Sequence, residues 1–305
     1  MISQGNLKRK WVKGEVAMKI QKVIFCWCCL FGGFVIYAQQ DERKPPVSII
    51  HEVTTLERLW RLLPTLSKSD LVLFDIDKVL VVGKDTMHRA TAAQRKNVRK
   101  PMNMLDGQKR ARVRTAAVVQ RKRMLVDKKT PELIKRMQKK GVVVGALTRC
   151  YAGPFELIPR LEDCRIKELL ELGIDFSLSF PTLEEHVFEE LLYNGRHPLF
   201  KKGILFASHC DKGEVLRAFL RYRQWTPARI IFVDNSQENV IAVSQAAQTI
   251  GVPYIGFLYK AAYHIPGEFN EQLAQFQIRH LIDHEVVLDD DAAQELLQKE
   301  QGKAD

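Results

Sequence analysis

The chain has 305 residues, of which 46% are hydrophobic and 27% are charged, with 17 glycines and 12 prolines. This composition is typical of a globular protein and excludes a low-complexity chain. The length suits one α/β domain with an insertion, or two small domains. The formal net charge of +11 is uneven: residues 1–38 carry about +5, residues 84–129 about +12, and the remainder about −6. A mildly acidic body therefore carries a basic leader and one basic segment.

The leader has the pattern of an export signal. Two lysines follow Met18, and the uncharged residues 23–38 end at Ala38 before a polar stretch. As a helix these 16 residues would span about 24 Å, short of the roughly 30 Å of a bilayer core. We predict a secretory signal peptide within residues 1–38, preceded by extra sequence. An uncleaved membrane anchor formed by residues 23–38 is the alternative.

Three of the six cysteines lie in the leader, which leaves Cys150, Cys164 and Cys210. An odd number permits at most one internal disulfide, and three free thiols fit equally well. The cysteines and histidines show no zinc-ligand spacing, so the sequence predicts no zinc site.

Buried-strand and helix patterns alternate after the leader. Residues 39–69 are interpreted as a linker followed by a helix. We expect strands near 71–76, 142–148, 173–180, 228–236 and 252–260, a hairpin near 196–208, and helices near 130–141, 159–172, 212–225 and 237–251. Strands that alternate with helices predict an α/β fold with a doubly wound, Rossmann-like parallel sheet. The acidic tail, 286–305, is expected to be a solvated helix or a frayed end.

The basic segment 84–129 shows no strand pattern and is expected to be largely helical, with breaks near Pro101 and Gly107. The predicted domains are thus a leader (1–38), a linker with a helix (39–69), a core (70–83 and 130–285), a basic insertion (84–129) and a tail (286–305).

Polar residues follow the predicted strands at their carboxyl ends, where parallel sheets bind ligands. Asp75 and Asp77 end the first strand, and two carboxylates so close need a positive partner. The other polar residues at this edge are Thr148, Lys212 at a helix start, Asp234 and Asn235.

The segments "LVLFDIDKV", "VVVGALT", "CDKGEVL" and "IIFVDNSQEN" resemble the four ordered motifs of the haloacid dehalogenase (HAD) superfamily of phosphatases and phosphotransferases. The resemblance covers about residues 71–258. The third segment, with its neighbours, also resembles uncharacterised exported HAD-like proteins of Gram-negative bacteria. Such a protein would be periplasmic, or anchored to the inner membrane if residues 23–38 are not removed.

The resemblance implies a role for each motif residue. Asp75 would be the nucleophile that forms an aspartyl-phosphate, and Asp77 the general acid and base. Mg²⁺ would bind Asp75, the backbone carbonyl of Asp77, and Asp234 or Asn235. Thr148 and Lys212 would bind the phosphate. These roles predict an exported, Mg²⁺-dependent phosphatase, with Lys202 as a competitor for the role of Lys212.

Two departures from the HAD pattern leave an alternative open. Lys78 follows the second aspartate, where it could lower the pKa of Asp77 or instead point away toward the substrate, and Asn235 replaces a second aspartate. The alternative is a non-catalytic binding protein on this fold.

In the HAD superfamily an insertion after the first motif is a cap over the active site, so the resemblance implies a basic cap formed by residues 84–129. A cap of about +12 suits a phosphorylated small molecule with further negative charges. An anionic membrane surface is an equally compatible partner. Export and the absence of aromatic residues from the segment argue against nucleic acid.

Overall fold

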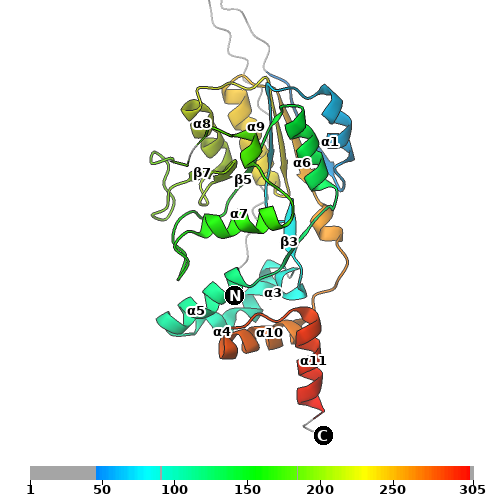
Figure 1. Ribbon diagram of the computed structural model, residues 1–305, viewed down its shortest axis with the longest axis vertical. Helices are drawn as coiled ribbons and strands as arrows, with labels where there is room; N and C mark the ends of the chain where they lie inside the picture. Colours follow the sequence, from blue (N-terminus) through cyan, green and yellow to red (C-terminus); the bar gives the residue numbers. More distant parts are fainter. Residues whose placement is uncertain (1–45, 90, 184, 303–305) are drawn as a thin grey trace, which may run out of the picture. The chain divides into compact units, whose positions relative to one another are not determined.

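An eight-stranded sheet forms the centre of the part of the chain that the computed structural model describes, residues 46–302 apart from 90 and 184 (Figure 1). The first six strands in the spatial order are parallel, and the seventh is antiparallel to both of its neighbours. This arrangement confirms the predicted α/β fold class. The strands, in spatial order, are β1 (Ser48–Val53), β10 (Tyr254–Tyr259), β9 (Arg229–Asp234), β2 (Asp70–Phe74), β5 (Val143–Thr148), β8 (Ile204–Phe206), β7 (Leu199–Lys201) and β6 (His186–Val187).

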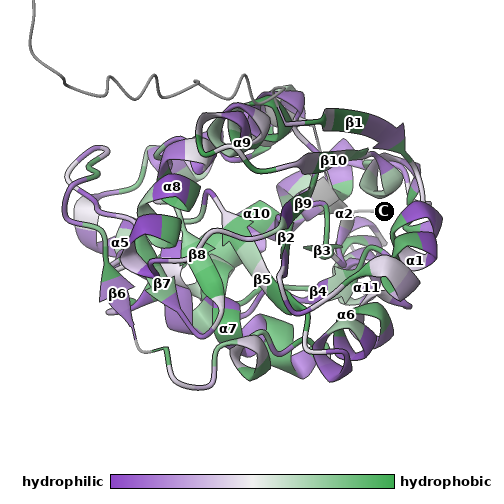
Figure 2. Ribbon diagram, turned by 90° about the horizontal axis from the view of Figure 1, so that it is seen from above, coloured by the Kyte–Doolittle hydropathy of each residue, from purple (hydrophilic) through white to green (hydrophobic). Residues whose placement is uncertain are grey.

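Helices cover both faces of the sheet (Figure 2). On one face lie α1 (Glu57–Leu62), α6 (Thr130–Lys139) and α7 (Leu161–Glu171), and on the other lie α8 (Lys212–Tyr222) and α9 (Gln237–Thr249). All five residues of β2 are buried, as expected of a central parallel strand covered on both sides.

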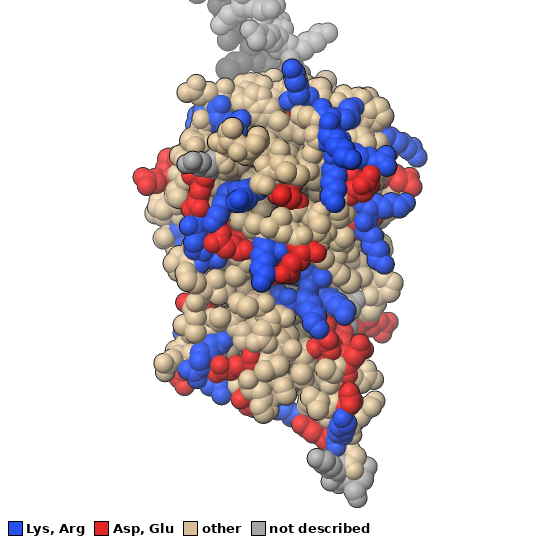
Figure 3. Space-filling model, in the orientation of Figure 1, with Lys and Arg blue, Asp and Glu red and all other residues tan. Residues whose placement is uncertain are grey.

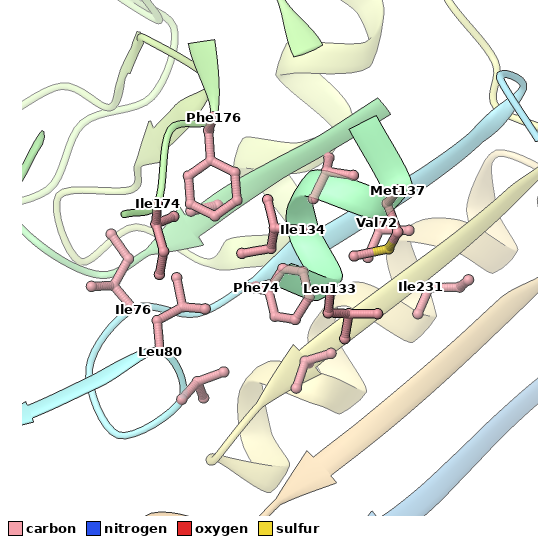
Figure 4. Packing of buried hydrophobic residues seen from close by; sticks show 14 of the residues in the cluster. Val72, Phe74, Ile76, Leu80, Leu133, Ile134, Met137, Ile174, Phe176 and Ile231 are labelled. Atoms are coloured by element: carbon pink, nitrogen blue, oxygen red, sulfur yellow. The ribbon is translucent and has the colours of Figure 1, made fainter. Parts of the chain in front are cut away.

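The side chains of β2 alternate between the two layers. Val72 and Phe74 belong to the cluster with α6, and Leu71 and Leu73 to the cluster with α8 and α9. Figure 4 shows Val72 and Phe74 among residues of α6, whose apolar side chains recur at helical spacing. The strand that leads to Asp75 is therefore held rigidly from both sides.

Two predicted segments differ from the structure. Ser48–Val53, interpreted as linker, forms β1, which pairs with β10 at the edge of the sheet. Its partner is distant in the sequence, so local composition gave no indication of the pairing. Residues 173–180, predicted as a strand, form the 3-10 turn Ser177–Ser179. The carboxylate of Asp175 accepts hydrogen bonds from the backbone N–H and hydroxyl of Ser177, which bends the chain.

A helical layer follows β2. The antiparallel strands β3 (Val81–Gly83) and β4 (Arg123–Leu125) form its stem. Between them lie α2 (Thr86–Arg89), α3 (Ala92–Val98), α4 (Lys100–Asn103) and α5 (Gly107–Val119). Pro101 lies in the first turn of α4, and Asp106 caps α5, so the helices break near the predicted positions. Strand β4 lies in the segment that shows no strand pattern, so it was not predicted.

Helix α10 (Glu271–His284) completes this layer. Its residues Ala274, Ile278 and Leu281 are buried against Met102 and Val113 of the insertion. Our domain division assigned residues up to 285 to the core, whereas α10 packs on the insertion. The layer is therefore built from two segments that are far apart in the sequence.

The acidic tail forms α11 (Asp290–Gln301), whose residue Ala293 is buried with Leu273 and Phe276. Just before this helix, Asp289 pairs with Lys122 at 2.9 Å, and Glu285 pairs with Arg112 at 2.8 Å. The tail thus offsets part of the charge of the insertion. On the face in Figure 3, acidic and basic side chains are interleaved instead of forming one basic surface.

No helix in residues 46–302, as far as they are described, has the length and apolar character needed to cross a membrane. The predicted signal lies outside the described residues. Cys150, Cys164 and Cys210 are free.

The packing of α10 on the insertion predicts a stability effect. Ile278→Ala removes a side chain that is 2% exposed between α10 and the insertion, and should lower the free energy of unfolding by about 2–5 kcal/mol. Ile241→Ala is the matched control, because Ile241 is 39% exposed on α9, and should change it far less. Urea unfolding measures both. Equal effects would show that α10 does not stabilise the layer.

Candidate active site

Lys212 is the centre of the candidate site. Its ammonium Nζ donates hydrogen bonds of 2.7 Å to Oδ1 of Asp75 and 2.7 Å to Oδ2 of Asp234. The Lys212 and Asp234 side chains are 0% exposed, and that of Asp75 is 10% exposed. One cation therefore balances two buried carboxylates, and the three contacting groups come from α8, β9 and the end of β2.

The start of α8 holds Lys212 in this position. Asp211 caps the helix by accepting a hydrogen bond from the N–H of Glu214. Gly213 lets the helix approach α9 closely, since a Cβ at this position would lie 2.4 Å from the carbonyl oxygen of Ala242. The close approach places Lys212 beside Asp234, which precedes α9.

Burial raises the pKa of Asp75 to about 7, although Lys212 opposes the shift and Asp234 adds to it. Only Oδ1 of Asp75 is engaged by Lys212, and no hydrogen bond from the described residues reaches Oδ2. Asp75 is thus a desolvated carboxylate with one oxygen available for a further partner.

Asp234, by contrast, has protein donors on both oxygens. Oδ1 accepts from the N–H of Ser236 at 2.7 Å, and the amide of Asn239 contacts Oδ1 at 3.2 Å and Oδ2 at 3.1 Å. With Lys212 also bound, this carboxylate is engaged by three residues. Its direct role in the structure is to hold Lys212 and the start of α9.

Asp77 lies two residues after Asp75, but its carboxylate contacts arginines. Arg165 Nη2 is 3.0 Å from Oδ2, and Arg123 Nη1 is 3.1 Å from Oδ1. Burial alone would raise the pKa of Asp77, but Arg165, Arg123 and Arg121 outweigh it and lower that pKa. The side chain is 44% exposed, so it remains accessible.

Asn235 and Lys78 both contact Tyr263, in the short helix η3 (Ala261–His264). The amide Nδ2 of Asn235 donates to the Tyr263 hydroxyl at 3.1 Å, and Nζ of Lys78 lies 5.1 Å from the ring centroid. Lys78 has a left-handed backbone, with φ of 66°. Tyr263 therefore contacts the two residues at which the sequence departs from the HAD motifs.

Thr148 ends β5, beside β2, and is 2% exposed. Its Oγ1 accepts a hydrogen bond of 3.3 Å from the N–H of Cys150. Because β5 and β2 are parallel neighbours, Thr148 lies at the same end of the sheet as Asp75, as the sequence predicted. Lys202, the competitor for the role of Lys212, is exposed on the turn between β7 and β8.

A pocket of about 480 Å³ opens beside Asp77, between the core and the helical layer. Five of its lining residues are Lys or Arg and one is Asp: Lys78, Arg99, Arg121, Arg123, Arg165 and Asp77. Tyr263 also lines it. The pocket therefore has a positive lining next to the candidate general acid.

Asp75 and Asn235 each have one side-chain oxygen that accepts no hydrogen bond from the described residues. They are Oδ2 of Asp75 and, because Nδ2 of Asn235 is the atom bonded to Tyr263, Oδ1 of Asn235. Across the described residues, no group of three or more His, Cys, Asp or Glu side chains could hold a metal ion. Mg²⁺ needs only one or two carboxylates and keeps several waters, so this donor set suits it. Of the two residues predicted as the other side-chain ligand, Asp234 accepts hydrogen bonds from protein donors on both carboxylate oxygens. Oδ1 of Asn235 does not.

Sequence reasoning missed Asn239, Arg123 and Arg165. Asn239 is in the first turns of α9, facing Asp234. Arg165 lies four residues from both Leu161 and Leu169 on the buried face of α7. A charged residue at the helical spacing of apolar ones could have indicated a buried arginine. Arg123 had no comparable signal, because its position depends on the pairing of β3 with β4.

Comparisons with known proteins show which family the chain matches. The family described as "Protein of unknown function (DUF2608)" matches residues 52–294. An uncharacterized protein of Rickettsia prowazekii is 26% identical over 92% of this chain and 99% of its own length. A protein of Chlamydia pneumoniae, named "Putative outer membrane protein", is 30% identical over 48% of this chain and 51% of its own length. A protein of Chlamydia trachomatis with that name is 24% identical, again over about half of each chain.

Among solved structures, a HAD family enzyme of Bacteroides thetaiotaomicron, crystallised as a magnesium complex, matches 61% of this chain and 91% of its own. The sequence identity is 15% and the TM-score is 0.30. This likeness is too distant to carry an argument about chemistry.

The two buried ion pairs predict a stability effect. Lys212→Met leaves two buried carboxylates without their cation and should lower the free energy of unfolding by about 3–5 kcal/mol. Lys202→Met is the matched control, because its side chain is exposed, and should change that free energy by about 0.5 kcal/mol or less. Urea unfolding at pH 7 measures both. Similar losses in the two variants would contradict the central role of Lys212.

Proposed function

The chain belongs to the DUF2608 family, and we propose that it is an exported, Mg²⁺-dependent phosphatase that acts through an aspartyl-phosphate on Asp75. The observation that carries the proposal is the contact of Lys212 with both Asp75 and Asp234, beside a positively lined pocket. A cation next to a carboxylate nucleophile lowers the repulsion of an anionic phosphate.

In the first step, Oδ2 of Asp75 attacks phosphorus, and the bond from phosphorus to the leaving oxygen breaks. Lys212 holds the carboxylate through Oδ1 and stabilises charge near the phosphate. Mg²⁺ would be held by Oδ1 of Asp75, which has a second lone pair besides the one that accepts from Lys212, by Asn235 and by water. It would supply further positive charge against the phosphate oxygens. Thr148 and the backbone beside it would bind a phosphate oxygen.

Asp77 would donate a proton to the leaving oxygen and then take one from the water that hydrolyses the aspartyl-phosphate, releasing phosphate and restoring Asp75. The arginines that contact Asp77 lower its pKa, and a charged carboxylate cannot donate a proton. The proposal therefore requires Arg123 and Arg165 to move from Asp77 when substrate binds. The contact with these arginines, and not Lys78, is the main obstacle to acid catalysis.

Export is the second part of the proposal. It is supported by the signal pattern in residues 1–38 and by the names of the chlamydial relatives. Those matches span about half of each relative, so the names bear on this chain only as support.

The paired state of Asp77 supports a second candidate, a non-catalytic protein that binds an anionic ligand in the pocket. It would bind inorganic phosphate and retain binding after Asp75→Asn, with no turnover of any phosphate ester. An anionic membrane surface is a less favoured ligand, because acidic residues at 285 and 289 pair with the basic insertion.

The test is turnover of p-nitrophenyl phosphate by the full chain. Activity is expected with Mg²⁺, should disappear with EDTA, and should fall at least about a thousandfold in Asp75→Asn, since the nucleophile is lost. Asp106→Asn is the matched control, because this exposed N-cap keeps its capping function as asparagine. Full activity in Asp75→Asn would contradict the mechanism. No turnover of this ester or of a broad panel of phosphate esters would favour the second candidate.

A further inference from the structure

The wall of the pocket beside Asp77 holds more positive than negative charge. Among the described residues, Arg121, Arg123 and Arg165 contact two carboxylates there, those of Asp77 and Glu168. Arg121 Nε and Arg165 Nη1 each lie 2.7 Å from Glu168, so this carboxylate accepts from both. Three guanidinium groups against two carboxylates leave one unbalanced positive charge.

The same arginines have unused hydrogen-bond donors. Each guanidinium offers five N–H groups, far more than two carboxylates take up. The Nε atoms of Arg123 and Arg165 are buried without a hydrogen-bond partner. The side chain of Arg165 is 7% exposed and that of Arg123 is 13% exposed, so water reaches them little. Burial of such groups without partners is costly, which favours an anionic ligand.

The arginines come from separate elements that meet only in the folded chain. Arg123 lies in β4, Arg121 just before it, and Arg165 in α7. All three line the pocket, whose other walls include Tyr263 and Lys78. The three arginines therefore form a largely buried cluster between the core and the helical layer, and not a group of exposed surface lysines.

We propose that Arg121, Arg123 and Arg165 bind a second anionic group of the substrate, a carboxylate or phosphate on the same small molecule as the phosphate that reacts at Asp75. The inference rests on the proposed function for the position of the reacting phosphate. Guanidinium groups bind such anions in bidentate fashion.

Binding of the second anion would also weaken the ion pairs of Asp77 with Arg123 and Arg165. An anion bound to the arginines competes with Asp77 for Arg123 and Arg165, whose contacts at 3.1 Å and 3.0 Å hold the carboxylate. Release from these contacts leaves the Asp77 side chain free to move away from both guanidinium groups. A substrate without the second anion leaves Asp77 paired with them, so the subsite couples substrate choice to the position of Asp77.

Binding of two non-reacting phosphonates tests the subsite. 3-Phosphonopropionate and propylphosphonate have the same chain length, but the first ends in a carboxylate and the second in a methyl group. The full chain with Mg²⁺ should bind the first about tenfold more tightly by calorimetry, as expected for a charge-assisted hydrogen bond. Equal affinities would overturn the proposal, whatever the behaviour of the variants.

Arg121→Gln should abolish most of this preference. Its side chain is 15% exposed and pairs with Glu168 alone, so it is the arginine least required for folding. Lys122→Gln is the matched control: it removes a charge from the adjacent residue, whose side chain is 59% exposed and pairs with Asp289, and should keep the preference. A preference retained in Arg121→Gln, or lost equally in Lys122→Gln, would contradict the subsite.

The outcome is separable from that of the phosphatase test, since binding is measured without turnover. A tenfold preference in a chain that hydrolyses no ester would keep the subsite and reject the phosphatase. Turnover of p-nitrophenyl phosphate with equal phosphonate affinities would reject the subsite alone.

Discussion

The ammonium group of Lys212 between two buried carboxylates determines the geometry at the carboxyl edge of this sheet. Asp75 follows β2 and Asp234 ends β9, two neighbouring strands whose like charges would repel without it. The cation must come from a helix that starts at the same edge, which requires α8 to approach α9 at Gly213. Both oxygens of Asp234 then accept from protein donors, whereas no hydrogen bond from the described residues reaches Oδ2 of Asp75. The site therefore has a rigid interior, and Asp77, two residues after Asp75, lines the pocket.

The helical layer supplies the other half of the site. It is built from the insertion and from α10, with the acidic tail paired to its basic residues. Because these contacts reduce its excess charge, the layer does not act as a uniform positive surface. The remaining positive charge is concentrated around the arginines of the pocket, where it contacts Asp77. Under the proposed mechanism, selectivity and acid catalysis would depend on the same side chains.

Local sequence signals were sufficient for the parts of the site that lie at the ends of strands. Asp75, Thr148 and Asp234 each follow an apolar run, and Lys212 begins an amphipathic helix, so topology alone brings them to one edge. The arginines that hold Asp77 depend on contacts between elements distant in the sequence, and no local pattern marks Arg123. The same reason explains β1, whose strand character depends on β10, and the packing of α10 on the insertion. The sequence therefore predicted the fold class and the edge of the sheet at which these residues meet, but not the environment of Asp77.

The most direct test of the central claim is the site of covalent phosphorylation. The full chain would be incubated with acetyl phosphate and Mg²⁺, quenched with acid, and mapped by peptide mass spectrometry. The account predicts one phosphoryl group on the peptide that contains Asp75, absent from Asp75→Asn and trapped for longer when Asp77 is replaced by Asn. A phosphoryl group on another residue, or rapid turnover with Asp75 unmodified throughout, would contradict it.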